Sequence, residues 1–199
     1  MTYLQISALI YLFTYFGIII GLRSYLLYKR TGINALRHVE KDGIAGIVEK
    51  ILAVGLVVIA VVVLNFVFLE NNYLLLVPIP YLLHPMIGYI GIGMSLVGLI
   101  IGIVAQLQMG DAWRLGLNKT ETTTLVYKGL FRFSRNPIYL SIFISNIGFF
   151  LMMPNALSFT FVVLNYVALE IKIRLEEEYL TNTHGEEYIS YQNKVRRWI

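Results

Sequence analysis

Two polar clusters flank an apolar stretch in the second half of the chain, and their residue types could do chemistry. Arg135, Asn136 and Pro137 precede this stretch, and Glu176, Glu177 and Glu178 follow it. A proline at position 154 breaks the stretch into two helices, which predicts an apolar hairpin. The arms of a helical hairpin return to the same membrane face, so a basic entry and an acidic exit are expected to meet at the bilayer surface. The exposed amides of a helix that starts at Pro137 add a weak positive pole, which suits an anionic group.

Each cluster also has a structural explanation by itself. Arg-Asn-Pro before a membrane helix is typical of an interfacial anchor, with Ser134 or Asn136 as the cap of that helix. Consecutive glutamates are typical of a solvated helix face. Glu170 differs, because an ionisable group near or within a membrane helix is expected to face the bundle interior or a water-filled pocket. It could equally pair with Arg174 at helical spacing.

The composition indicates an integral membrane protein. Of the 199 residues, 57% are apolar and 14% are charged, against about 25% charged in a soluble domain. The mean hydropathy is +0.69. The chain has no cysteine and three scattered histidines, which excludes a disulfide framework and a thiolate site and makes a histidine metal cluster unexpected. We therefore predict no metal, and the length favours a single domain over residues 1–199.

Five apolar runs divide the chain, and we predict an all-α fold with about five membrane-spanning helices. A helix needs about 20 apolar residues to cross the hydrocarbon core. The runs cover residues 3–28, 44–69, 86–107, 138–152 and 157–171. In the third run, Gly88, Gly91 and Gly98 predict close packing against neighbouring helices. Residues 70–85 are short and broken by prolines, so an interfacial or re-entrant segment is expected there.

The positions of the basic residues predict the orientation of these helices. All 16 Lys and Arg residues lie near the ends of the runs that share one membrane face. The positive-inside rule then places the N-terminus outside and the C-terminus in the cytoplasm. This pattern explains the net charge of +4 without nucleic-acid binding.

An ordered set of motifs then points to a family. Its members are Gly110-Asp111-x-Trp113-Arg114, Leu125-Val126, Gly129-Leu130-Phe131, Arg135-Asn136-Pro137-Ile138-Tyr139, Glu176-Glu177-x-x-Leu180 and His184-Gly185-Glu186-Glu187-Tyr188-x-x-Tyr191. The order, with the apolar hairpin in the middle, resembles the isoprenylcysteine carboxyl methyltransferase family and its phospholipid methyltransferase relatives. The resemblance covers residues 108–199, which would form the cofactor-binding part after a three-span part at 1–107.

The resemblance implies a methyltransferase that uses S-adenosylmethionine. Its cofactor pocket would face the cytoplasm, closed by the last hairpin and the C-terminal helix, and a lipophilic or prenylated substrate would enter from the bilayer. The cofactor-contacting positions that carry over are Thr123, Thr124, Leu125, Val126, Phe131, Asn136, Pro137, Ile138, Tyr139 and Glu176. Glu176 would receive the ammonium group of the cofactor, and Leu125, Val126 and Phe131 would enclose its adenine.

Three candidate catalytic cations follow from the same resemblance, namely Arg135, Lys172 and Arg174. They would orient an anionic acceptor such as a carboxylate. The family's substrate-contacting arginine is replaced here by Lys172, which lacks the bidentate fork, and Arg174 could substitute for it. Asn136 and His184 replace a histidine and an aromatic residue of the family pattern. These departures bear on the carboxylate acceptor more than on cofactor binding.

Other functions remain open at this stage. An amine N-methyltransferase would use the same scaffold, and its acceptor would need a general base, for which Glu170 or a neighbouring glutamate is the candidate. Sterol reductases, which use NADPH, have a related membrane fold. A membrane scaffold or transport protein is the non-enzymatic alternative. A transporter would place its charged or broken helices at mid-membrane, whereas here the charges gather at one face. The sequence leaves the oligomeric state and the methyl acceptor open.

Overall fold

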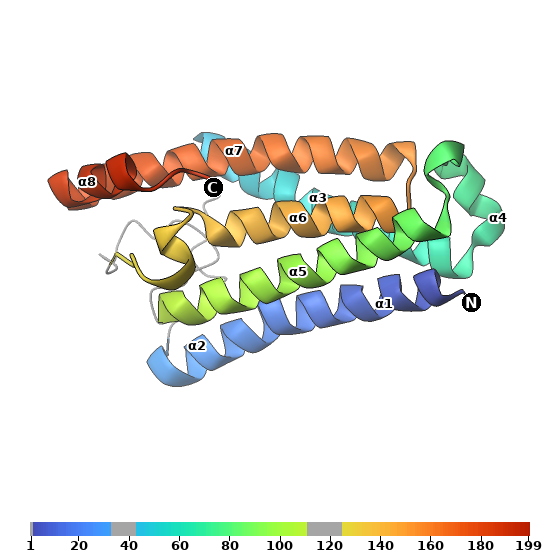
Figure 1. Ribbon diagram of the computed structural model, residues 1–199, viewed down its shortest axis with the longest axis horizontal. Coiled ribbons are helices and arrows are strands. Elements are labelled where there is room, and N and C mark those ends of the chain that lie inside the picture. The colour runs from blue at the N-terminus through green and yellow to red at the C-terminus, as the bar shows by residue number, and fades with distance from the viewer. Residues whose placement is uncertain (1, 33–42, 111–124) are drawn as a thin grey trace.

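The computed structural model describes residues 2–32, 43–110 and 125–199, and these form a bundle of roughly parallel and antiparallel helices (Figure 1). In chain order, the longer elements are α1 (Tyr3–Tyr15), η1 (Phe16–Leu22), α2 (Arg23–Thr31), α3 (Gly43–Phe68), α5 (Pro85–Met109), α6 (Pro137–Met152), α7 (Ala156–His184) and α8 (Glu186–Lys194). Elements α1, η1 and α2 form one continuous helix whose middle turns are π-helical. The predicted all-α class is confirmed over the described residues.

Four of these helices are long and apolar enough to cross a membrane. They cover Tyr3–Thr31, Gly43–Phe68, Pro85–Met109 and Ala156–His184. The fourth predicted span corresponds to α6, which has 16 residues. At a rise of about 1.5 Å per residue, this length falls short of a hydrocarbon core of about 30 Å. The described part of the chain thus supports a multi-pass membrane protein, and the count of five spans stays a prediction.

Small residues bring α5 and α6 into close contact, as the glycine pattern predicts. A Cβ atom at Gly91 would lie 2.6 Å from the carbonyl oxygen of Gly148, and one at Gly98 would lie 2.8 Å from the carbonyl oxygen of Ser141. Both distances are shorter than any real Cβ contact. The two backbones can approach this closely because the glycines have no side chain. This packing places the start of α6 beside the end of α5, at the polar end of the bundle.

The segment between α3 and α5 lies against the turn between α6 and α7. It contains the short helices α4 (Glu70–Tyr73), η2 (Leu74–Leu76) and η3 (Pro80–Leu82). The backbone nitrogen of Ile79 donates to the oxygen of Pro154 (2.9 Å), and that of Ala156 donates to Val77 (3.0 Å). Asn155 then caps α7, its side chain accepting a hydrogen bond from Ser158 at 2.8 Å. Short helices replace a spanning helix here, as the prolines predict, and the interfacial or re-entrant position of the segment stays a prediction.

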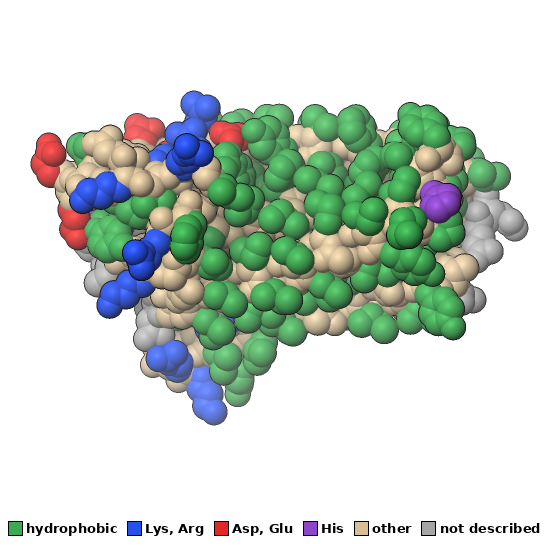
Figure 2. Space-filling view, viewed as in Figure 1, with side chains coloured by type: hydrophobic (Ala, Val, Ile, Leu, Met, Phe, Trp, Pro, Cys, Tyr) green, Lys and Arg blue, Asp and Glu red, His purple; other side chains and the backbone are tan. Residues whose placement is uncertain are grey.

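Charged side chains gather at one end of the bundle. Figure 1 shows the N-terminus, α4 and the α6–α7 turn at one end, and α2, α8 and the C-terminus at the other. In the same view, the coloured Lys, Arg and Glu side chains lie at the end with α2 and α8, and apolar side chains cover most of the remaining surface (Figure 2). This distribution is the one expected of a protein whose apolar length lies in lipid.

Candidate functional site

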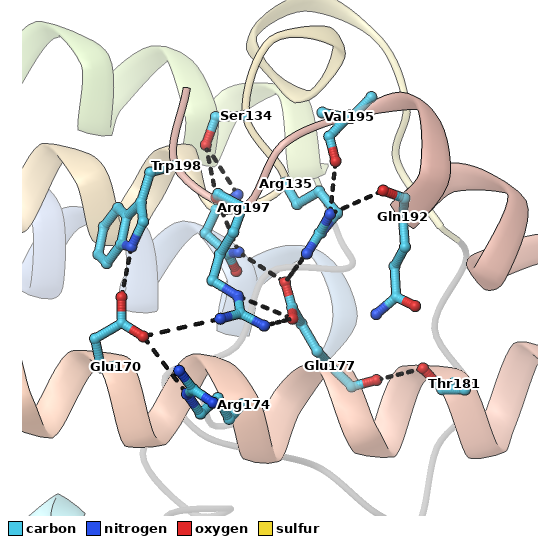
Figure 3. A network of polar contacts seen from close by, with 11 residues as sticks. Ser134, Arg135, Glu170, Arg174, Glu177, Thr181, Gln192, Val195, Arg197 and Trp198 are labelled. Carbon is cyan, nitrogen blue, oxygen red and sulfur yellow. Dashed lines mark hydrogen bonds and ion pairs between the residues drawn. The ribbon is translucent and has the colours of Figure 1, made fainter.

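At the polar end, Glu177 of α7 holds a hydrogen-bonded network (Figure 3). Its carboxylate is buried, with 5% of the residue exposed. Oε1 accepts from Nε of Arg135 at 3.0 Å and lies 2.8 Å from a terminal nitrogen of the same guanidinium. Oε2 accepts from Arg197 at 3.1 and 2.8 Å. The hydrogen bond to Glu177 raises the pKa of the Arg197 guanidinium above its ordinary value. One carboxylate thus joins α7 to both the start of α6 and the tail.

Arg135, a candidate catalytic cation, fastens the tail as well as Glu177. A terminal nitrogen of its guanidinium donates to the carbonyl oxygens of Gln192 (3.0 Å) and Val195 (2.6 Å). Its backbone nitrogen donates to the carbonyl oxygen of Arg196 at 3.0 Å. A planar guanidinium suits such multiple contacts. The geometry therefore gives Arg135 a structural role in this state of the protein.

Asn136 lies where α6 begins, but its side chain does not cap that helix. The amide nitrogen instead donates to the carbonyl oxygen of Arg197 at 3.2 Å and to Glu177 at 3.4 Å. The hydroxyl of Ser134 accepts from the backbone nitrogen of Asn136 (3.1 Å) and donates to the Arg197 carbonyl (3.3 Å). The capping prediction for both residues is wrong, because the tail competes for their polar groups. The tail covers Asn136, a predicted cofactor contact.

Glu170 and Arg174 lie on a second branch of the same network. Glu170 accepts a hydrogen bond from the indole nitrogen of Trp198 at 2.6 Å. Its other oxygen lies 3.6 Å from Arg174, the helical neighbour predicted from the sequence, and 3.9 Å from Arg197. The Arg174 side chain is 68% exposed. The structure therefore places this candidate cation on the outer side of α7.

A separate group of buried polar side chains comes from α3, α6 and α7. The hydroxyl of Tyr139 donates to Glu176 at 2.7 Å, which joins two predicted cofactor positions. The ammonium of Lys172 lies 2.6 Å from a carboxylate oxygen of Glu49 and 6.0 Å from the centroid of the Tyr139 ring. Lys172 is buried, with 8% of its surface exposed. We call these four residues the α3–α7 cluster.

The apolar candidates lie where the segment at 125–131 meets α8. Phe131 is buried, and its carbonyl oxygen accepts from the hydroxyl of Tyr191 at 2.6 Å. Burial raises the pKa of Tyr191 to about 12. Tyr127 donates to Glu187 at 2.6 Å, and its ring meets that of Tyr191 edge-on. These contacts attach the segment to α8. Leu125, Val126 and Ile138 are half-buried, Pro137 is fully buried, and Thr123 and Thr124 lie outside the described residues.

Sequence reasoning missed three members of these networks. Glu49, Arg197 and Trp198 are not among the candidate residues that the sequence motifs indicate. A signal existed for Glu49, because a carboxylate inside an apolar run needs a partner. No local signal marks Arg197 or Trp198, because their partners lie 20 and 28 residues away along the chain.

Fold and site together define an all-helical membrane protein with two polar networks at one end. The sequence profile described as the isoprenylcysteine carboxyl methyltransferase (ICMT) family matches residues 91–182. That range contains Asn136, Tyr139, Lys172 and Glu176. We therefore place the chain in this family of methyltransferases.

Two curated proteins are similar to parts of the chain. Protein-S-isoprenylcysteine O-methyltransferase of Saccharomyces cerevisiae is 38% identical over 78 residues, which are 39% of this chain and 33% of the yeast protein. An uncharacterized protein of Haemophilus influenzae is 33% identical over 63 residues, which are 31% of this chain and the whole of that protein. The alignment thus spans about a third of the yeast relative.

A solved structure of the eukaryotic intramembrane Ras methyltransferase ICMT has a similar fold. The TM-score is 0.57 at 18% identity, and the match covers 95% of this chain and 67% of that structure. The likeness in fold therefore extends to the first two spans, which precede the residues that the sequence profile matches.

Proposed function

We propose that this protein is a membrane methyltransferase that transfers the methyl group of S-adenosylmethionine to a lipophilic acceptor at the polar end of the bundle. One observation carries the proposal. Tyr139 and Glu176 are 37 residues apart in the sequence, both belong to the family's cofactor pattern, and their side chains meet at 2.7 Å. The family match over residues 91–182 supports the same reaction class.

The residues present fit this cofactor. When bound, S-adenosylmethionine supplies a methyl group on a positively charged sulfur. Glu176, held by the Tyr139 hydroxyl, offers a carboxylate for an ammonium group. Phe131, Leu125 and Val126 offer apolar surface for an adenine ring. The main contribution of the protein to such a displacement is proximity and alignment, which can lower the barrier by several kcal/mol, up to about 11.

The leading acceptor is a carboxylate, as in the O-methylation named for the yeast relative. A carboxylate attacks without a general base, so the protein needs only to hold it in place. Lys172 is the candidate for this contact because it lies in the α3–α7 cluster, 6.0 Å from the Tyr139 ring centroid. We propose that the acceptor enters from the bilayer and that this end of the bundle faces the cytoplasm.

A second candidate is an amine acceptor, and a specific observation favours it. Each of the three candidate cations pairs with a carboxylate: Arg135 with Glu177, Lys172 with Glu49 and Arg174 with Glu170. These pairs reduce the positive charge available to an anionic acceptor. An amine would need a base, and Glu170 is occupied by Trp198 and two arginines. A neighbouring glutamate would then have to serve as the base.

The experiment that tests the cofactor is a titration of the full chain, purified in detergent. Calorimetry with S-adenosylmethionine and S-adenosylhomocysteine is expected to give micromolar affinity, with NADPH as the negative control. Glu176→Gln and Tyr139→Phe should weaken binding about tenfold, because a hydrogen bond that involves a charged group contributes about 1.5–3 kcal/mol. Glu178→Gln, an exposed neighbour on α7, is the matched control.

The outcomes separate the alternatives. Binding of both sulfur compounds, weakened by the two variants, supports the proposal. Binding of NADPH alone would favour the reductase alternative. A folded, monodisperse sample that binds none of the three compounds would overturn the proposal in favour of a membrane scaffold.

A further inference from the structure

Glu49 is a carboxylate on α3, in the part of the chain that the family profile does not match. It lies near the start of a helix whose other residues, apart from Lys50, are uncharged. Its side chain is 17% exposed, and that of its partner Lys172 is 10% exposed. An ionised carboxylate in this position needs a partner because the loss of hydration is costly. The ammonium of Lys172, at 2.6 Å, is that partner.

The contact connects two parts of the bundle at the proposed site. Lys172 is 123 residues from Glu49 in the sequence. It lies near the ring of Tyr139, whose hydroxyl binds Glu176. The charges of Glu49 and Lys172 therefore both contribute to the electrostatic potential beside Tyr139 and Glu176. In a partly buried setting, an opposite charge at 2.6 Å cancels most of the field that an ammonium exerts at a distance.

We propose that Glu49 is a specificity-determining residue that sets the charge of the acceptor. By neutralising Lys172, Glu49 lowers the preference of the site for a carboxylate acceptor relative to an amine acceptor of the same shape. The inference rests on the proposed function, and it adds α3 to the elements that form the acceptor site. It concerns a ratio between two acceptors, so it holds whichever of them is the natural one.

The test uses two probes that differ in one group. The first is N-acetyl-S-farnesylcysteine, whose reactive group is a carboxylate. The second is the analogue in which an aminomethyl group replaces the carboxylate. For each variant of the full chain, kcat/KM is measured with both probes, and the affinity for each probe is measured without cofactor. The ratio of carboxylate to amine is the readout.

Substitutions that change the charge of the Glu49–Lys172 pair in opposite directions should shift the carboxylate-to-amine ratio in opposite directions. Glu49→Gln leaves the pair with a net charge of +1 and should raise the ratio on the order of tenfold. Lys172→Met leaves −1 and should lower it by a similar factor. The double variant Glu49→Gln/Lys172→Met is uncharged and should return the ratio to that of the wild type, a coupling that a double-mutant cycle measures. Lys50→Gln, an exposed neighbour on α3, is the control.

A purely structural role predicts a different result. If Glu49 only ties α3 to α7, Glu49→Gln and Lys172→Met lower activity and affinity equally for both probes and leave the ratio unchanged. That result overturns the inference. If Glu49→Gln fails to fold, Glu49→Asp replaces it, because the shorter side chain retracts the charge and should shift the ratio in the same direction by a smaller factor.

The failure of this inference can be told from failure of the proposed function. If the wild type binds S-adenosylmethionine and the ratio does not move, the inference alone fails. If the wild type binds no S-adenosylmethionine, the proposed function fails, and the equilibrium affinities for the two probes still decide whether Glu49 selects the charge of a bound lipid.

Discussion

Arg197 lies over α7 with two guanidinium nitrogens 3.1 and 2.8 Å from one carboxylate oxygen of Glu177. The other oxygen of Glu177 is held by Arg135. Through this shared carboxylate the tail after α8 folds back onto the start of α6, where the Arg197 carbonyl accepts from Asn136. Asn136, a candidate cofactor residue, is thus held by Ser134 before α6, by Glu177 of α7 and by Arg197 of the tail.

The first prediction concerns the stability that Glu177 supplies. Glu177→Gln keeps the shape of the side chain but removes the carboxylate that Arg135 and Arg197 share, and Arg197 keeps only Glu170, at 3.9 Å, as a counter-charge. We expect a loss of about 3 kcal/mol in the free energy of unfolding, the low end of the range for a broken buried ion pair, because the Arg197 side chain is 31% exposed. Thermal unfolding in detergent measures it. The exposed control Glu178→Gln should stay within about 0.5 kcal/mol of the wild type. Equal melting temperatures for the two variants would contradict the prediction.

The second prediction separates a structural from a catalytic role for Arg135. Arg135→Lys keeps the charge but loses the planar fork that reaches Glu177, Gln192 and Val195. Hydrogen exchange in the tail, residues 192–199, should become faster by at least about tenfold. The affinity for S-adenosylmethionine should change less than in Glu176→Gln. Unaltered exchange together with lost methyl transfer would instead assign Arg135 to catalysis.

The third prediction tests the packing of α5 on α6. Gly91→Ala places a methyl group 2.6 Å from the Gly148 carbonyl oxygen and 2.8 Å from the Met152 nitrogen. The two helices must separate, so we expect a loss of about 1–3 kcal/mol in stability. Gly93→Ala on the same helix has no atom within 4 Å of the new carbon, and it should be neutral or stabilising by up to about 1 kcal/mol. The prediction fails if both variants melt at the same temperature.

The fourth prediction concerns alkaline pH. The pKa of Tyr191 is raised from 10.0 to about 12 by burial. Its contribution to stability is therefore present below pH 10 and is lost as the pH rises through 12, because the unfolded chain releases the proton first. Tyr191→Phe should reduce the fall in melting temperature between pH 9.5 and about 11.5. An unchanged pH dependence would show that the pKa of Tyr191 is not raised in the folded protein.

Much of the fold could be predicted from the sequence, because its signals are local. The apolar runs gave the helices, and Pro154 gave the hairpin. Gly91 and Gly98 gave the close approach of α5 and α6. Each of these signals depends on residues within one or two turns of each other, where composition and spacing control the structure.

The order of the motifs also indicated a set of candidate cofactor positions. Two of them, Tyr139 and Glu176, are joined by a hydrogen bond in the structure. Their roles in binding a cofactor stay predictions. The side of the membrane that the polar end of the bundle faces also stays a prediction. Thr123 and Thr124 lie outside the described residues.

The tertiary structure decided which charge pairs with which. From the sequence, Glu177 was one of three consecutive glutamates and Arg135 was a candidate catalytic group. The fold brings both together with Arg197 and pairs Lys172 with Glu49, 123 residues away. Such pairings depend on how each helix is rotated about its axis and on where the tail turns back. Those are properties of the packed bundle, and residue spacing along a single helix does not encode them.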